Sequence, residues 1–411
     1  MATYITLTGD TFDRIARKEY GTEQEAGRIK RANPGLTEPF SAGISVAVPP
    51  LPNAPKNKPQ ETAANDINEV AVLINGKRFR FWTSSTINRH IDSIDTIEFS
   101  APFEPSDKDV RETFRPGSFK DLQITVGGKP LFTGTLIGVA PVLSKEKRTV
   151  SVTGYALPGV LNDCNASAAM AESLENDNQT LKDIAATLVG PFGLSVVFDV
   201  EPGPIFERTK CATGKKVLTY LAELAKQQNL IINSTEQGAL RFTQSVTVGK
   251  PVAVLKQGES PVLSVTPTQN MQQYYSHITG FQPTMLGIPG VQHTEKNPFL
   301  TGVVRPLSFE APDTEDSNVP ASVKAKIGRM FGNIISYSVS VSTWRDPSGE
   351  LWKPNTTIKL EAPGAMIYNS YEFIIRSVSL TKTSSSESAV LTLVLPGAFS
   401  GEIPEALPWD D

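Results

Sequence analysis

Histidine and cysteine are scarce in this chain, and their scarcity excludes several kinds of site. The 411 residues include three histidines and two cysteines, Cys164 and Cys211. His90, His277 and His293 lie far apart and lack the HxH or HxxxH spacing of a metal site. Two cysteines without a nearby histidine cannot hold a structural zinc ion, and they indicate reduced thiols rather than a disulfide scaffold. We therefore expect no metal site.

Long apolar runs and an excess of basic charge are also missing. No stretch approaches the roughly 18–20 apolar residues that span a bilayer, and the N-terminus lacks the basic and apolar regions of a secretory signal. We therefore expect no transmembrane segment and synthesis in a cytoplasm. Lysine and arginine total 39 against 43 aspartates and glutamates, a formal net charge of −4. Phosphate binding needs an excess of basic residues, so specific nucleic-acid binding is not expected.

Sequence motifs of catalysis are absent as well. No serine stands in a GxSxG elbow, so a hydrolase triad has no starting point. Asp313, Glu315 and Asp316 form an acidic cluster, but glycoside hydrolysis needs two carboxylates held at a defined separation across a cleft. This cluster lies in a polar, loop-like stretch that is typical of a solvated loop. We expect no catalytic residues, no cofactor and no enzymatic activity.

The chain instead shows a modular, globular composition, with 39% hydrophobic and 20% charged residues. Its length predicts two to four modules. Apolar patterns over residues 1–50 predict a strand, two helices and a closing strand. Residues 49–60 contain five prolines, which favour an extended tether. We therefore predict a small domain over 1–50 and a linker over 51–65.

Residues 66–164 read as an antiparallel β domain. Alternating apolar residues flank Asn75-Gly76, a pair that accepts the positive φ angles of a type I′ hairpin turn. Further strands are predicted at 122–126, 131–139 and 149–153, with a charged turn at 145–147. The pattern indicates a barrel or a sandwich.

The middle of the chain changes character. Apolar residues recur at helical spacing from Leu181 and from Val217, and short apolar strands follow each helix. This pattern predicts an α/β insertion over residues 165–245. A loop-rich connecting β segment is predicted over 246–319, with long loops at 282–318. A second β domain is predicted over 320–411, beginning with a short helix.

Strands of the two β domains repeat one another. The segments at 122–126, 131–139 and 149–153 reappear at 358–360, 371–380 and 390–395, and Val139 and Val378 lie 239 positions apart. The repeat indicates a duplicated β domain, although any two β meanders can align by chance. The alternating serines and threonines at 336–343 suit either a strand that adds to a neighbouring sheet or an ordinary solvent-facing strand.

The first fifty residues resemble a LysM module, most closely the short LysM-like tail protein X family of phage tails. The resemblance is carried by Gly9-Asp10-Thr11, Ile15-Ala16, Tyr20-Gly21, Asn33-Pro34-Gly35-Leu36 and residues 46–49. It implies a shallow groove that docks a protein or binds peptidoglycan. The groove residues would be Gly9, Asp10, Thr11, Phe12, Asn33, Pro34, Gly35 and Leu36. The alternative is that Asp10 or Thr11 caps a helix and Asn33-Pro34 ends one.

The remainder resembles the baseplate hub family of contractile tails, typified by the hub of phage Mu. The motifs that carry this resemblance are Phe114-Arg115-Pro116-Gly117, Phe132-Thr133-Gly134, Val152-Thr153-Gly154-Tyr155, residues 161–166, Pro191-Phe192-Gly193-Leu194 and Trp352-Lys353-Pro354-Asn355. The resemblance implies a β-rich α+β multidomain fold. In this fold two related antiparallel β-barrel tube domains accompany the α/β insertion and the N-terminal βααβ domain.

The resemblance also implies partners and a place of action. It implies a homotrimer in the virion tail baseplate, assembled in the host bacterial cytoplasm, that joins the hexameric tail tube to the trimeric central spike. Partners would be the tail tube or tube-initiator protein, the spike and the baseplate wedge proteins, with a tape measure protein and peptidoglycan as further candidates. Two alternatives remain: a peptidoglycan-binding LysM module on a β scaffold, and the hub of a non-contractile tail or a contractile injection system.

Overall fold

The chain forms two compact units, Met1–Gln60 and Glu61–Asp411. The computed structural model describes residues 2–6, 9–20, 23–49, 66–144, 148–166, 174–246, 249–282, 290–311 and 319–410. The predicted turn at 145–147 and the acidic cluster of Asp313, Glu315 and Asp316 lie outside these residues. None of the helices that the structure describes is long and apolar enough to cross a membrane.

The first unit has the predicted βααβ order. It comprises β1 (Ala2–Ile5), α1 (Phe12–Tyr20), the 3₁₀ helix η1 (Glu23–Glu25), α2 (Ala26–Ala32) and β2 (Ser45–Val48). The two strands pair antiparallel, with Tyr4 opposite Val46. The unit buries a core of its own, made of Phe12, Ile15, Ala16, Ala26, Ile29, Phe40, Val46 and Val48.

The second unit begins with the predicted β region. Its elements are β3 (Val70–Ile74), β4 (Lys77–Phe79), β5 (Ser84–His90), β6 (Thr96–Pro102), α3 (Lys108–Thr113), β7 (Asp121–Val126), β8 (Lys129–Leu143) and β9 (Arg148–Ala156). Asn75 and Gly76 have φ angles of 49° and 72°, the left-handed conformation that a type I′ turn requires. The hairpin prediction is confirmed.

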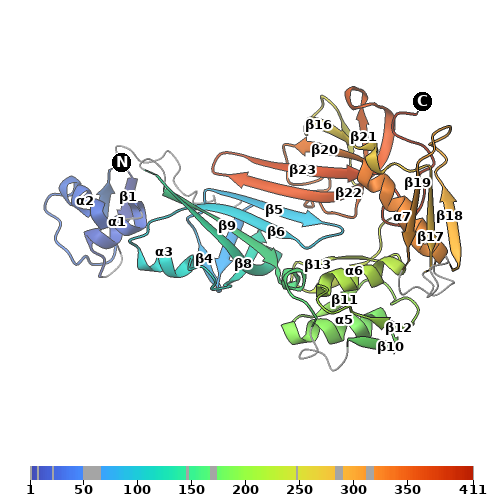
Figure 1. The fold of residues 1–411 in the computed structure, drawn as a ribbon. Helices are drawn as coiled ribbons and strands as arrows, with labels where there is room; N and C mark the ends of the chain where they lie inside the picture. The colour runs from blue at the N-terminus through green and yellow to red at the C-terminus, as the bar shows by residue number, and fades with distance from the viewer. Residues whose placement is uncertain are drawn as a thin grey trace. The chain divides into compact units, whose positions relative to one another are not determined.

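The α/β insertion follows β9 and is coloured green in Figure 1. It contains η2 (Leu157–Gly159), α4 (Val160–Asp163), β10 (Glu175–Gln179), α5 (Leu181–Val189), η3 (Gly190–Phe192), β11 (Val196–Phe198), β12 (Phe206–Lys210), α6 (Val217–Gln227), β13 (Ile231–Ser234) and β14 (Leu240–Thr243). A capping box of Thr180 and Asp183 starts α5. The strands β10 and β12 were not predicted, because their polar sequences show no apolar alternation.

The connecting segment is more regular than predicted. Its elements are β15 (Val254–Lys256), β16 (Val262–Gln269), η4 (Met271–Gln273), β17 (His277–Phe281), β18 (Gln292–Lys296), β19 (Pro306–Glu310) and α7 (Val319–Ile334). The prediction of long loops over 282–318 is wrong where β18 and β19 flank β17 in a three-stranded sheet. Their strand pattern was hidden because most of their side chains are polar. The helix α7 has 16 residues and is longer than predicted.

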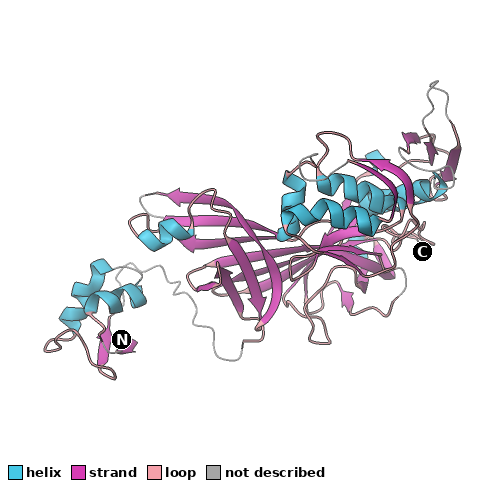
Figure 2. Ribbon diagram, turned by 90° about the horizontal axis from the view of Figure 1, so that it is seen from below, coloured by secondary structure: helices cyan, strands magenta, loops and turns pink. Residues whose placement is uncertain are grey.

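The C-terminal elements complete one large sheet. They are β20 (Ile335–Val341), β21 (Thr357–Ala362), η6 (Pro363–Ala365), β22 (Ile367–Thr383) and β23 (Glu387–Val394). The strand order is β16-β20-β23-β22-β5-β6-β9-β8-β7-β3-β4, with β21 between β22 and β15, which makes 13 strands. Figure 2 shows these strands as a continuous layer.

Two sequence predictions about this sheet need correction. The two β regions do not close into separate barrels, because β22 of the second pairs directly with β5 of the first and leaves an open sheet. The strand at 336–343 was expected to add to a neighbouring sheet. It is the inner strand β20, covered by β16 on one side and β23 on the other.

Candidate functional site

The sheet contains one topology twice. The strands β5-β6-β9-β8-β7 form one meander, and β16-β20-β23-β22-β21 form another with the same chain order and the same antiparallel neighbours. We call these the first and second meander. The first is continuous in sequence, whereas β17, β18, β19 and α7 separate β16 from β20 in the second.

The register of the two meanders also agrees. Val139 lies opposite Val152, and 239 positions later Val378 lies opposite Leu391. The pairing shifts between Leu136 and Gly138 in one meander and between Ile375 and Ser377 in the other, again 239 positions apart. A one-residue slip would exchange the faces of a strand, so two unrelated meanders would rarely share a register and a bulge. The repeat in the sequence therefore corresponds to a repeated structure.

The strands β5 and β22 join the two meanders. Residues 84–90 pair antiparallel with residues 377–383 over seven positions, which places the strands side by side in Figure 1. Polar side chains support the pairing: the Thr86 and Thr381 hydroxyls lie 3.2 Å apart, and Ser379 Oγ donates to Asn88 Oδ1 at 2.7 Å. We call this contact the internal junction.

One face of the joined meanders is rich in hydroxyl groups, and we call it the hydroxyl face. Alternate residues of six strands form it: Ser84, Thr86, Asn88 and His90; Thr96, Glu98 and Ser100; Ser151, Thr153 and Tyr155; Ser336, Ser338 and Ser340; Ser377, Ser379, Thr381 and Thr383; Ser388, Val390 and Thr392. All are partly or fully exposed, whereas the residues between them on β5 and β20 are buried. Burial lowers the pKa of His90. The set contains one carboxylate side chain, that of Glu98.

The opposite face of β5 is tied to the α/β insertion by buried charges. Arg89 is 6% exposed and forms ion pairs with Glu236 of the insertion and, at 3.5 Å, with Asp95. Asp95 accepts from His90 N at 3.0 Å, and its own N–H donates to Ser234 Oγ at 3.1 Å. Burial raises the pKa of Asp95 to about 6, against the attraction of Arg89. This cluster fixes the insertion beneath the sheet.

A second buried cation fixes the start of the second unit beside the second meander. Lys382 is 5% exposed, and its Nζ donates to Asp66 Oδ2 at 2.5 Å and to Asn68 O at 2.6 Å. The Trp344 ring lies 5.8 Å from the ammonium group. Burial alone would raise the pKa of Asp66, but the hydrogen bonds from Lys382 and Asn68 hold it below its ordinary value.

The predicted groove residues of the first unit have mixed roles. Asp10 is buried and accepts from the Tyr4 hydroxyl at 2.8 Å, and Phe12 packs edge-on against Phe40 at 4.9 Å. Asn33 donates to Ala47 O and accepts from Ala47 N, which ties it to β2.

The remaining groove residues are more accessible. Gly9, Thr11 and Leu36 are half-buried, and Pro34 and Gly35 are exposed. Thr11 Oγ1 accepts from Arg14 N at 3.3 Å at the start of α1, and Asn33 follows α2 as its C-cap. The alternative reading, a helix cap and a helix stop, therefore holds for Thr11 and Asn33.

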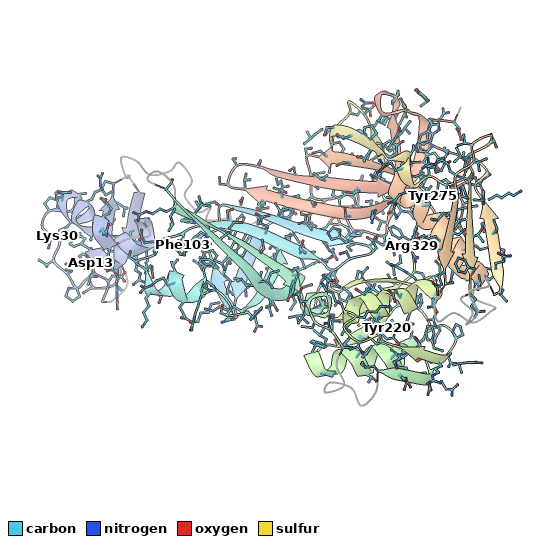
Figure 3. All side chains as sticks on the ribbon, viewed as in Figure 1. Asp13, Lys30, Phe103, Tyr220, Tyr275 and Arg329 are labelled. Atoms are coloured by element: carbon cyan, nitrogen blue, oxygen red, sulfur yellow. The ribbon has the colours of Figure 1, made fainter. Side chains whose placement is uncertain are left out.

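The insertion has a polar centre that belongs to its own packing. The Tyr220 hydroxyl, labelled in Figure 3, lies 3.1 Å from Thr209 Oγ1 and accepts from Asn176 Nδ2 at 3.3 Å. Burial raises the pKa of the Cys211 thiol, which disfavours a reactive thiolate. In the described part of the chain, no group of three or more histidine, cysteine, aspartate or glutamate side chains is placed to bind a metal ion.

Comparison with known proteins identifies the insertion. Residues 158–244 match the family described as baseplate hub protein gp44-like, second domain. The baseplate hub protein gp44 of Escherichia phage Mu is 22% identical over 329 residues, which cover 76% of this chain and 84% of the relative. The insertion is thus similar to the second domain of gp44-like baseplate hub proteins.

Solved structures share the fold of most of the chain. The 43 kDa tail protein of prophage MuSo2 from Shewanella oneidensis has a TM-score of 0.68 and 22% identity, covering 80% of this chain and 99% of that one. A tail protein from Neisseria meningitidis MC58 has a TM-score of 0.69 and 19% identity, covering 82% and 98%. These similarities establish the fold.

Proposed function

We propose that this chain is a structural hub of a phage-type contractile tail, a trimeric adaptor without a catalytic centre. The phage Mu relative is a baseplate hub protein by name, and the structures of similar fold are tail proteins. The observation that carries the proposal is the duplicated sheet, in which two equivalent meanders lie side by side within one chain.

The duplication supplies the symmetry that such an adaptor needs. Three copies around an axis would present six similar meanders, which match a hexameric tail tube on one rim. The subunits themselves repeat three times, which matches a trimeric spike on the other rim. The internal junction sets the relation between two neighbouring meanders, and closed rings of this kind are common among homo-oligomers.

In the proposed ring the hydroxyl face lines the axial channel. The opposite face of the sheet is buried under the α/β insertion and the rest of the core, as the Arg89–Glu236 ion pair shows, so the hydroxyl face is the one left open. Short hydroxyl side chains give weak hydrogen bonds, and Glu98 contributes the single carboxylate in the set. Such a wall would let an elongated cargo pass without holding it.

The proposed surroundings follow from the same role. We place the chain in the virion tail baseplate after assembly in the host cytoplasm. Its proposed partners are the tail tube or a tube-initiator protein, the central spike and the wedge proteins, with a tape measure protein as a further candidate. The hub of a non-contractile tail or of a contractile injection system would use the same ring.

Light scattering on the purified chain tests the adaptor directly. We expect a mass of three times 44.5 kDa, with dissociation only on dilution. A mass of 44.5 kDa at every concentration up to the solubility limit would contradict the proposal, and so would a dimer.

For the first unit we propose docking to another tail protein rather than to peptidoglycan. Asp10, Phe12 and Asn33 are engaged in the fold of the unit, so a sugar chain would meet mainly Pro34, Gly35 and the unit's solvent-exposed charges. A fragment of residues 1–52 contains the whole core of the unit and is suited to a pull-down on insoluble peptidoglycan. We expect it to stay in the supernatant; strong retention would instead favour the peptidoglycan-binding alternative.

A further inference from the structure

Two long strand edges of the sheet, β16 and the outer half of β8, remain open in the described residues; the terminal strands β4 and β15 have only three residues each. In the described residues β16 pairs only with β20, and the sheet ends there. The strand β8 pairs with β7 through residues 129–135, so its outer half, residues 138–143, has β9 on one side and no strand from the described part of the chain on the other. Open edges of this length are templates for pairing with another chain.

These edges are the counterparts of the two strands that form the internal junction. A shift of 239 positions carries residues 138–143 of β8 onto 377–382 of β22, with the same partners on β9 and β23. A shift of 180 positions carries residues 84–89 of β5 onto 264–269 of β16, again with matching partners on β6 and β20. The outer half of β8 is thus equivalent to β22, and β16 is equivalent to β5, the two strands that pair with each other at the internal junction.

The backbone groups that point outward from the open edge of β16 also correspond to those that form hydrogen bonds at the internal junction. Ile91 N donates to Arg376 O, which continues the β5–β22 ladder and makes Ile87 and Leu380 a hydrogen-bonded pair. On β16, Asn270 N donates to Ile334 O, so the backbone groups of Val265, Pro267 and Gln269 point away from β20 to the open side. Their counterparts on β5 are the residues that bond to β22.

Apolar side chains are buried at the internal junction and exposed on the open edges. Val378 and Leu380 are fully buried at the internal junction. On the open edges, Val142 is 51% exposed, Leu143 is 56% exposed and Leu263 of β16 is 62% exposed. Apolar side chains on exposed strand edges are unfavourable in an isolated chain, so both edges are suited to be covered.

We propose that β16 of one copy adds antiparallel to the outer half of β8 of the next copy, in the register of the internal junction. Val142 then lies opposite Thr266 of the partner subunit, as Thr381 lies opposite Thr86 within one chain. The two edges differ, so the contact is head-to-tail, and it forms the ring of the proposed trimer when the rotation between copies closes after three. This inference rests on the proposed trimer and names the surface that builds it.

One feature weakens this contact relative to the internal junction. Pro141 and Pro267 fall opposite each other, where Leu380 and Ile87 stand in the internal junction. Proline has no N–H, so this pair lacks both hydrogen bonds, while the pairs on either side retain theirs. Prolines at open edges also hinder indiscriminate strand pairing before assembly.

Cysteine cross-linking tests the register. Non-hydrogen-bonded antiparallel pairs have Cα atoms about 4.5 Å apart, within the range of disulfide geometry. Val142→Cys with Thr266→Cys, in a Cys164→Ser background, should give covalent trimers on non-reducing gels after mild oxidation. Val142→Cys with Thr268→Cys is the matched control, two residues out of register. Thr86→Cys with Thr381→Cys is the internal control and should oxidise without a change of chain mass.

The outcomes separate this inference from the proposed function. Covalent trimers from the first pair and at least tenfold less from the out-of-register pair would support the junction. A trimeric mass in light scattering without cross-linking of the first pair would overturn the junction and leave the trimer standing. Equal cross-linking of both pairs would overturn the register. A monomer at all concentrations would overturn the inference and the proposed trimer together.

Discussion

The buried carboxylate of Asp95 gives a pH-dependent prediction about the contact between sheet and insertion. Asp95 is 4% exposed, and burial raises its pKa from 3.8 to about 6. A group whose pKa is raised in the folded state contributes stability that is complete below pH 3.8 and is lost as the pH rises through 6. A difference of one pKa unit corresponds to about 1.36 kcal/mol, so the rise from 3.8 to about 6 corresponds to a contribution of about 3 kcal/mol.

The substitution Asp95→Asn removes the titration and keeps an acceptor for the His90 N–H. The free energy of unfolding of the variant minus that of the wild type should therefore rise by about 2.5 kcal/mol between pH 4 and pH 7, since part of the contribution is already lost at pH 4. Urea unfolding followed by circular dichroism at several pH values measures this difference. Asp95 pairs with Arg89, which also pairs with Glu236 of the insertion, so the effect should include the contact with the insertion.

Asp66→Asn is the matched control with the opposite sign. Its pKa is held below the ordinary value, so Asp66 contributes stability at neutral pH that is lost on acidification. The Asp66 variant should therefore lose stability relative to the wild type as the pH rises from 3 to 7. A variant-minus-wild-type difference for Asp95→Asn that stays constant from pH 4 to pH 7 would refute the reasoning.

Two further predictions concern the sheet edges and the buried lysine. Replacing Pro141 by Leu and Pro267 by Ile, the residues at the equivalent positions of the internal junction, adds two N–H donors to the proposed contact. At ~1 kcal/mol per hydrogen bond, each donor should lower the dissociation constant of the trimer by about fivefold or more, as measured by sedimentation. An unchanged dissociation constant would contradict the pairing. Lys382→Met should cost about 1–3 kcal/mol, because it removes the hydrogen bonds that the buried ammonium group donates to the half-buried Asp66 and to Asn68 O. Lys256→Met, at a surface pair with Glu361, should cost at most about 1 kcal/mol in urea unfolding; equal costs would refute the burial argument.

Local signals allowed much of the fold to be predicted from the sequence. The Asn75-Gly76 hairpin depends on backbone conformations that those two residues accept, and α5 and α6 depend on apolar spacing within one segment. The repeat was visible because predicted strand positions recur at one separation, 239 residues, and the structure shows a bulge at the same separation. Each of these features is encoded within a short stretch of chain.

The features that the sequence did not reveal are non-local. Alternation in 84–90 indicates which residues are buried but not that their partner is 377–383, so separate barrels were expected in place of one joined sheet. The ion pair between Arg89 and Glu236 likewise joins residues of two regions. For the groove of the first unit, the sequence identified turn residues but not that Asp10 and Asn33 bond within the unit.

Electron cryomicroscopy of the purified assembly would show how the two meanders are arranged around the axis. We predict a threefold ring in which the first and second meanders alternate around the axis, so that the averaged sheet region shows an approximate sixfold repeat with the hydroxyl face toward the channel. A ring in which the two meanders lie at different radii, or in which the hydroxyl face points outward, would contradict this prediction.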